Sequence, residues 1–293
     1  MIFKRRGFPV LMDSEGEGAK NYSTGIQLLM CYNILMTWAF KRQLFYAGVL
    51  VVFLFILGFL IIFPYINKIP TCTDNKQNGD ESGIDCGGSC PRACTFEVDK
   101  ISVLWSRTFE VIPGRYNLVA YLENHNRNKA IKKIKYKFRL SDKDNIYIGK
   151  RDGETFIPAS GKFVIFEAGV GVGNSVPIYT TFEFTETPIW NNVSEDKLNQ
   201  LKILVSDIKL ENQNTSPHLS ATIKNNSLFT IPEVNVVALL YDETGNAVSA
   251  SRTYLDVLEG EEVENVNFTW PEPIPGNIVA KEIIPMYNIF LVK

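Results

Sequence analysis

The chain has 293 residues, of which 45% are hydrophobic and 21% charged, and its formal net charge is −2. This length suits about two domains, and the composition matches neither a disordered chain nor a polytopic membrane protein. The balanced charge gives no indication of nucleic-acid binding. Only two histidines occur, His125 and His218, and neither lies beside a nucleophile motif. We therefore predict no enzymatic activity, no cofactor and no small-molecule substrate.

Residues 44–63 read LFYAGVLVVFLFILGFLIIF and contain no charged residue. Because about 20 helical residues cross a bilayer core about 30 Å thick, we predict one transmembrane helix, acting as an uncleaved signal anchor. Lys41 and Arg42 precede the segment, so the positive-inside rule places residues 1–43 in the cytoplasm and the C-terminal part outside it. A cleavable signal peptide is the alternative, but this core is too long and no small-x-small site follows it.

The N-terminal 35 residues show no clear pattern. Met36 begins MTWAFKRQLFYAGV, a compact basic region in front of the apolar segment. Met36 is therefore a second candidate start beside Met1, in which case residues 1–35 are spurious or disordered.

A cysteine-rich segment, expected as a stalk over residues 64–97, follows the anchor. In an oxidising compartment an even number of close cysteines pairs, and disulfides supply the order that so few apolar residues cannot. Four cysteines allow three connectivities, and all three stay open. Zinc is disfavoured because the spacing lacks C-x₂-C pairs and histidine. Calcium binding by the acidic loop 74–85 is a further alternative, although Lys76 would occupy an EF-hand ligand position. The cysteines are Cys72, Cys86, Cys90 and Cys94.

This segment resembles a short motif of secreted and surface proteins, C-x-D-x₃-N-G-x-E-x₃-D-C-G-G-x-C. The resemblance covers about two dozen residues and implies an extracellular setting rather than an activity. The matching residues are Cys72, Asp74, Asn78, Gly79, Glu81, Asp85, Cys86, Gly87, Gly88 and Cys90.

Two later segments share one pattern. Apolar residues at 134, 136, 138 and 140 alternate with basic ones, which is typical of a strand with one buried face. About a hundred residues on, positions 234, 236, 238 and 240 are apolar, and each strand ends at an aspartate, Asp142 or Asp242. Asn124 and Asn225 also correspond. The pattern indicates internal duplication.

Strand-like runs separated by turn residues predict an all-β fold of two tandem antiparallel β-sandwiches. We expect the first over residues 98–189, a linker with a short helical turn over 190–199, and the second over 200–293.

The repeats resemble F-x-L-Y-D-type bacterial surface domains, which are immunoglobulin-like or LEA14-like sandwiches. The first copy carries Phe138, Leu140 and Asp142, and the second carries Leu240, Tyr241 and Asp242, so each departs from the motif at one position. The resemblance implies a bacterial single-pass surface protein and transfers no catalytic chemistry.

Three other features have a functional and a structural interpretation. A basic row could bind a polyanion, or it could be a solvated strand face whose lysines discourage edge pairing. The Gly-rich stretch 167–177 is expected to be a loop or a bulge, because it lacks a phosphate-loop Gly-Lys-Ser/Thr. Trp105, Trp190 and Trp270 are expected to pack in cores rather than form a carbohydrate platform. The basic row comprises Lys132, Lys133, Lys135, Lys137 and Arg139.

Together these features predict a non-enzymatic protein of the cell membrane. Its extracytoplasmic sandwiches would serve binding or adhesion, with an envelope protein or a cell-wall polymer as partner. The alternative is an accessory subunit of an envelope, secretion or pilus-type assembly.

Overall fold

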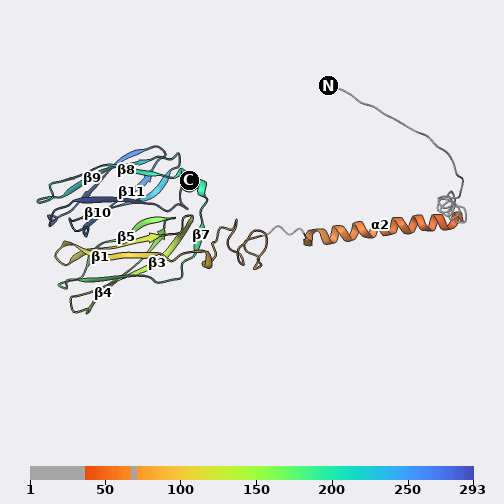
Figure 1. Cartoon of the computed structure of the whole chain (residues 1–293), viewed down its shortest axis with the longest axis horizontal. Coiled ribbons are helices and arrows are strands. Elements are labelled where there is room, and N and C mark those ends of the chain that lie inside the picture. Colours follow the sequence, from red (N-terminus) through yellow and green to blue (C-terminus); the bar gives the residue numbers. More distant parts are fainter. Residues whose placement is uncertain (1–36, 67–70) are drawn as a thin grey trace, which may run out of the picture. The chain divides into compact units, whose positions relative to one another are not determined.

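The computed structural model describes residues 37–66 and 71–293. These belong to two compact units that divide after Ile69. The first contains one long helix, α2 (Trp38–Ile66), and the second contains the cysteine-rich segment and all the strands (Figure 1). The expectations about residues 1–35 and the start at Met36 lie outside the described residues.

Helix α2 is long and apolar enough to cross a membrane. Its span Trp38–Phe63 has 26 residues and a mean hydropathy of 2.9, and none of it is buried. The helix begins at Trp38 rather than near residue 44, so Lys41 and Arg42 lie in its first turns and not ahead of it. The Arg42 guanidinium lies 4.7 Å from the ring centroid of Trp38. Large apolar side chains such as Phe55 are exposed on every side, as expected for a helix surrounded by lipid.

The second unit is built of antiparallel strands, with one short helix, α3 (Glu195–Gln200), and a 3₁₀ turn, η1 (Thr95–Glu97). The strands are β1 (Ser102–Ile112), β2 (Arg115–Asn124), β3 (Lys129–Ser141), β4 (Tyr147–Ile157), β5 (Gly161–Gly171), β6 (Tyr179–Phe184), β7 (Trp190–Asn192), β8 (Ile203–Glu211), β9 (His218–Asn225), β10 (Ile231–Tyr241), β11 (Ala247–Leu258), β12 (Val263–Thr269) and β13 (Ala280–Met286).

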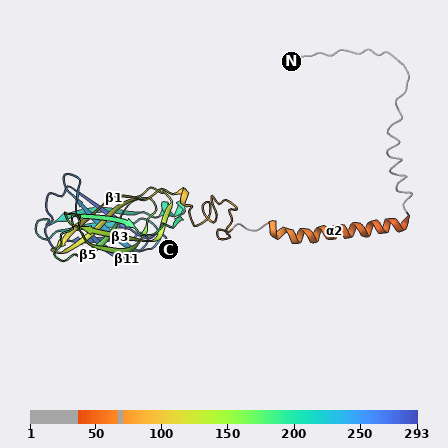
Figure 2. The same ribbon diagram turned by 90° about the horizontal axis from the view of Figure 1, so that it is seen from below.

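These strands form four sheets. The first half of the unit contains β1-β2-β5 and β4-β3-β6, with β7 also paired to β3. The second half contains β12-β9-β8 and β11-β10-β13. In two perpendicular views the long strands run in broadly similar directions (Figure 1 and Figure 2). The prediction of an all-β protein with one long N-terminal helix is confirmed.

Strand β3 shows why the alternating pattern predicted its buried face. Tyr136 is 5% exposed and Phe138 is fully buried, whereas the flanking Lys135 and Arg139 are exposed and Lys137 between the two aromatics is half-buried. The inward side chains pack against those of β2 and β5, including Leu118. Side chains alternate between the faces of a strand, so one face enters the core and the other stays in water.

The two halves also pack against each other, sheet on sheet (Figure 1). Strand β2 buries Val119 and Tyr121 on the face opposite to its own core, and β10 does the same with Val237 and Leu239. These side chains belong to one continuous apolar cluster with residues of β5, β11 and β13, such as Met286. The order of layers is therefore β4-β3-β6, β1-β2-β5, β11-β10-β13 and β12-β9-β8.

Polar contacts fix the register of this interface. The Glu282 carboxylate on β13 accepts hydrogen bonds from the hydroxyls of Tyr121 in the first half, at 2.8 Å, and Tyr241 in the second, at 2.7 Å. The Arg107 guanidinium on β1 donates to the carbonyl of Ala247, and that of Arg252 on β11 donates to the carbonyl of Phe166. Tyr121 is buried, and Tyr241 and Glu282 are half-buried. Displacing one half from the other would leave these groups without partners, which costs about 1–3 kcal/mol for a buried polar group.

One buried asparagine in each half holds a turn by the same set of contacts. Asn124 donates to the carbonyls of Lys129 and Pro158, and its Oδ1 accepts from the backbone N–H of Asn126. Asn225 donates to the carbonyls of Phe229, Leu258 and Glu259, and its Oδ1 accepts from the backbone N–H of Ser227. The side chain replaces backbone partners that the turn removes from the sheet.

The two aspartates that end β3 and β10 also play matching roles. Asp142 Oδ1 accepts from the N–H groups of residues 144 and 146, and Asp242 Oδ1 accepts from those of residues 244 and 246. The fourth turn residue has a positive φ in both, 60° at Asn145 and 77° at Gly245. Asparagine and glycine suit this conformation, so the Asp-x-x-Asn/Gly spacing specifies the turn.

Replacing Asn225 by alanine removes its side-chain bonds and leaves buried carbonyls unpaired. We expect Asn225→Ala to lower the free energy of unfolding by about 3 kcal/mol in urea denaturation of the detergent-solubilised chain. The neighbouring Asn226 is exposed, so Asn226→Ala serves as the control and should change little. Equal stabilities of the two variants would contradict the assigned role.

The interface tyrosines predict a loss of stability at alkaline pH. Burial, and secondly the hydrogen bond to Glu282, raises the pKa of Tyr121 and of Tyr241 above the usual value. The native state then keeps protons that the unfolded chain loses above pH about 10, so stability is full below that pH and falls above it. We expect the double variant Tyr121→Phe, Tyr241→Phe to show a shallower fall in urea denaturation between neutral and alkaline pH. Tyr147→Phe, at an exposed position, should leave the slope unchanged.

Candidate functional site

The cysteine-rich segment forms a clip closed by two disulfides. Cys72 pairs with Cys90, and Cys86 pairs with Cys94. This is one of the three connectivities that the sequence left open. The loops span 18 and 8 residues in sequence separation, and in the chain-entropy model each disulfide of such a size stabilises by about 3 kcal/mol.

The acidic residues of the clip hydrogen-bond to its own backbone. Asp85 accepts from the N–H groups of Asp74 and Asn75, and Glu81 Oε2 accepts from the N–H of Asn78. Hydrogen bonds from Ser89 lower the pKa of the Asp80 carboxyl. The carboxylates of Asp80, Glu81 and Asp85 are thus engaged with N–H and O–H donors of the clip itself.

Three glycines of the clip, Gly87 and Gly88 of the motif and Gly83 between its specified positions, lie where a side chain has little or no room. Gly88 has φ +54°, and an added Cβ would collide with the carbonyl oxygen of Asp80. A Cβ added at Gly83 would lie 3.0 Å from the sulfur atoms of both Cys86 and Cys94. The motif therefore encodes a compact disulfide fold.

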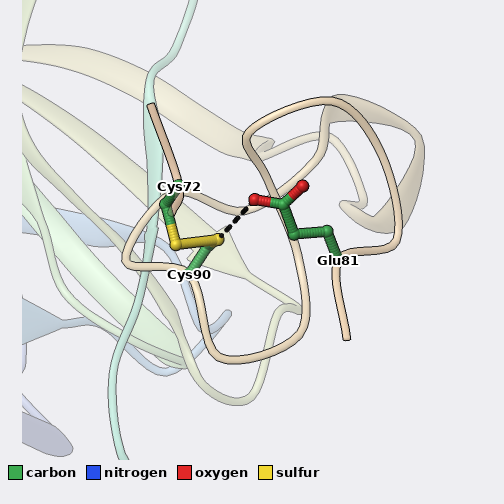
Figure 3. Close-up of side chains that lie close together, drawn as sticks. All are labelled: Cys72, Glu81 and Cys90. Carbon is green, nitrogen blue, oxygen red and sulfur yellow. Dashed lines mark hydrogen bonds between the residues drawn. A yellow bond between two sulfur atoms is a disulfide. The ribbon is translucent and has the colours of Figure 1, made fainter. Parts of the chain in front are cut away.

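One set of side chains in the clip resembles a metal site in composition only. Cys72, Glu81 and Cys90 lie together, with Glu81 Oε1 3.2 Å from Cys90 Sγ (Figure 3). The two sulfur atoms are joined in a disulfide, so neither is a thiolate and neither is a usual zinc ligand. Glu81 is 9% exposed, and its other oxygen, Oε2, accepts a hydrogen bond from the N–H of Asn78. These contacts indicate a structural role.

The clip is joined to the first sandwich rather than separate from it. The Ala93 N–H donates to the carbonyl of Trp190, and the Asn192 N–H donates to the carbonyl of Pro91 at 2.7 Å. The Asn192 side chain also donates to the carbonyl of Cys90. Residues 190–192, expected as linker, thus form strand β7 between β3 and the clip.

The basic row lies on the outer face of β3, whose paired neighbours supply acidic side chains. Lys133 contacts Glu154 at 2.6 Å, and Lys137 contacts Glu183 at 3.4 Å. Strand β3 pairs with β4 on one side and with β6 on the other. It is therefore not an edge strand, and the interpretation that its lysines discourage edge pairing is wrong. The remaining contacts are Lys135 with Glu186, Lys150 with Asp152, the Lys132 ammonium 5.0 Å from the Phe290 ring centroid, and the Arg139 guanidinium 5.6 Å from that of Tyr147.

These exposed ion pairs add little stability, but they cancel most of the positive field of the row. Arg139 forms no ion pair with any residue of the described ranges. It lines a shallow cavity of about 210 Å³ with Lys137, Tyr147 and Lys150. Lys132, at the other end of the row, forms no ion pair with a described residue either. A polyanion would therefore find unpaired charge at the two ends of the row and not along its middle.

The Gly-rich stretch, the tryptophans and the histidines have structural surroundings. Residues 167–171 belong to β5 and include a bulge opposite Asn117, whose Oδ1 accepts from the N–H of Gly169. Trp190 and Trp270 are 5% and 8% exposed, so neither forms an open platform, and Trp105 packs partly against the first core. The exposed His125 contacts Ser102 Oγ at 3.1 Å.

A cavity that the sequence did not indicate, of a size suited to a ligand, lies between the two halves. It has a volume of about 540 Å³ and is bounded by residues 108–113 at the end of β1, residues 248–249 of β11 and the proline-rich loop 270–275. Trp270 lines it, and the indole Nε1–H has no acceptor among the residues in the described ranges. The sequence signal was the run WPEPIPG, which looks like an ordinary loop.

A group of exposed apolar residues lies near this end of the first half. Ile146 and Tyr147 follow the β3–β4 turn, while Ile178 and Tyr179 begin β6, and each is more than half exposed. The N–H of Ile178 donates to the carbonyl of Ser141, which also pairs with Tyr147. Ser141 pairs with both Tyr147 and Tyr179, which brings these four residues near one another, and we call them the apolar tip. Exposed apolar side chains gathered in one region often mark protein contacts.

Comparisons with known proteins assign no family. No protein-family model matches the chain, and the curated proteins contain no match. Among solved structures, the chain is similar to a red sea bream transglutaminase, with 8% identity over 65% of this chain and a TM-score of 0.23. It is also similar to a β-glucuronidase of glycoside hydrolase family 2, with 10% identity over 75% of this chain and a TM-score of 0.22. The chain spans 30% and 29% of those proteins, and likeness at these scores carries no functional meaning.

The clip geometry predicts both its connectivity and its response to calcium. Non-reducing peptide mapping should recover the pairs Cys72–Cys90 and Cys86–Cys94. Because its carboxylates already bond to N–H groups, neither calcium nor a chelator should change the unfolding temperature of the full chain. The variant Cys72→Ser, Cys90→Ser provides the positive control, since it should unfold at a lower temperature. A calcium-dependent rise in the unfolding temperature would contradict this assignment.

Proposed function

We propose that this chain is a non-enzymatic, single-pass membrane protein whose second unit lies outside the cytoplasm and binds a partner at the cell envelope. One observation carries the proposal: along the chain, the apolar helix α2 is followed closely by two disulfides. Disulfides persist in oxidising compartments, so the clip supports an extracytoplasmic location for everything after α2. Lys41 and Arg42 at the start of the helix support a cytoplasmic N-terminus.

The proposal includes two tandem immunoglobulin-like sandwiches that arose by duplication, in a bacterial surface protein. The matching contacts of Asn124 with Asn225, and of Asp142 with Asp242, support this history. Each aspartate ends a central strand and holds the same turn, which agrees with the position of the aspartate in the F-x-L-Y-D resemblance. Such sandwiches present function through loops and strand edges.

The apolar tip favours a protein partner over a cell-wall polymer. Its four large side chains are each more than half exposed, as at surfaces that bury apolar area on association. The basic row, in contrast, is largely neutralised by its own sheet. An accessory subunit of an envelope assembly is therefore the second candidate, and it differs from an adhesin in having a fixed stoichiometry.

Membrane topology is tested first. We expect protease added to intact cells to cleave a C-terminally tagged chain on the outside, whereas a tag at the N-terminus stays protected until the membrane is opened. The reverse protection pattern, or release of the second unit as a soluble cleaved product, would contradict the anchored topology.

Cross-linking on intact cells, with purification through a tag at Lys293, then identifies the class of partner. A single protein at fixed stoichiometry would establish the assembly subunit, and co-purified wall polymer would establish a polymer-binding module. In the first case, Ile178→Ser with Tyr179→Ser should reduce the cross-link, while Leu228→Ser, at a separate exposed position, should not.

A further inference from the structure

The cavity between the two halves borders an open strand edge. Strand β1 pairs with β2 on one side only. The hydroxyls of Ser106 and Thr108 reach the carbonyls of Thr180 and Pro177, so the start of β6 covers the middle of the free edge. Beyond Thr108, no backbone hydrogen bond reaches this edge from the described parts of the chain. Alternate N–H and C=O groups of residues 109–112 therefore face outward without partners.

The same residues form one wall of the cavity. Six consecutive positions, 108–113, line it, although neighbouring side chains of a strand point to opposite faces. An unbroken run of this kind is expected where the edge of a strand, and not one of its faces, borders the space. A bulge near Val111 twists the end of the strand, but the edge remains uncovered.

The opposite wall suits an extended chain and cannot itself pair with the edge. Pro271, Pro273 and Pro275 lack backbone N–H groups, so this loop cannot complete the sheet. Gln213 anchors the loop by donating to the carbonyls of Ile274 and Gly276. Fixed in this way, the loop keeps the cavity open at a volume of about 540 Å³, within the range of ligand-binding sites.

The charge of the cavity indicates what it would accept. Glu110 and Glu272 line it and are exposed, and its described lining contains no lysine, arginine or histidine. Val248, Ile274 and Trp270 supply apolar surface. Unlike the lysines on the outer face of β3, neither glutamate forms an ion pair with a residue in the described ranges.

We infer that this cavity binds an extended peptide segment of a partner protein, which adds as a strand to the free edge of β1 and places basic side chains beside Glu110 and Glu272. Main-chain hydrogen bonds would supply affinity, and the alternation of basic and apolar side chains would supply specificity. This inference rests on the proposed function, because it names the chemistry of the partner for the same extracytoplasmic unit.

The test uses the full chain in lipid nanodiscs and a fluorescein-labelled peptide of alternating lysine and valine residues. We expect saturable binding by fluorescence anisotropy. The variant Glu110→Gln, Glu272→Gln changes two exposed side chains and should weaken binding at least about tenfold. Glu211→Gln, an exposed glutamate on β8 outside the cavity, is the matched control and should bind as the unaltered chain does.

A second probe tests strand pairing without changing the protein. The same peptide with alternate amides N-methylated cannot donate along one edge, and we expect its affinity to fall at least about tenfold. Equal binding of this peptide, equal binding of an alternating glutamate–valine peptide, an unchanged affinity of the double glutamine variant, or no binding at all would overturn the inference. Each result would make the cavity a solvent-filled gap between the sandwiches.

Failure here is distinguishable from failure of the proposed function. If topology and cross-linking hold but the peptide does not bind, the chain is an envelope protein with its partner site elsewhere. If the peptide binds but the C-terminal tag is cytoplasmic, the peptide-binding site is supported and the proposed role at the cell envelope is wrong.

Discussion

The face-to-face packing of β1-β2-β5 on β11-β10-β13 is the contact on which the rest of the second unit depends. It buries apolar side chains of both halves in one cluster, and Glu282 joins Tyr121 to Tyr241 across it. A carboxylate that accepts from two hydroxyls, one of a buried and one of a half-buried tyrosine, permits only a narrow range of positions. The two sandwiches therefore form one body, and the cavity between their ends has fixed walls.

Much of this fold could be predicted from local patterns. Alternation in β3 identified its buried face, and the asparagine and aspartate positions matched in both halves because each side chain completes a turn. The stacking could not be predicted in the same way. Val119 and Tyr121 lie between the residues that face the first core. Their apolar character indicates a strand covered on both faces, and a search for alternation alone does not detect it.

The candidate sites divide in the same way, into features with a local sequence pattern and features without one. The disulfide clip was predictable because its cysteines and their hydrogen-bonding neighbours are close in sequence. Only the structure shows which cysteines pair. The basic row was visible, but the acidic side chains that neutralise it come from β4 and β6, far along the chain. The cavity combines a hairpin of one half with a proline-rich loop of the other, and residues about 160 positions apart leave no local pattern to recognise.

The C-terminal segment returns to the part of the unit where the chain enters. Asn288 donates to the carbonyl of Lys132, close to the point where β3 pairs with β7 and β7 meets the clip (Figure 1). If the chain is anchored and binds a partner at the opposite loops, as proposed, a pull between the two would enter through the clip and run along the strands. Antiparallel strands pulled lengthwise must break several hydrogen bonds together, so the body would transmit tension without extending, as a rigid lever and not as a spring.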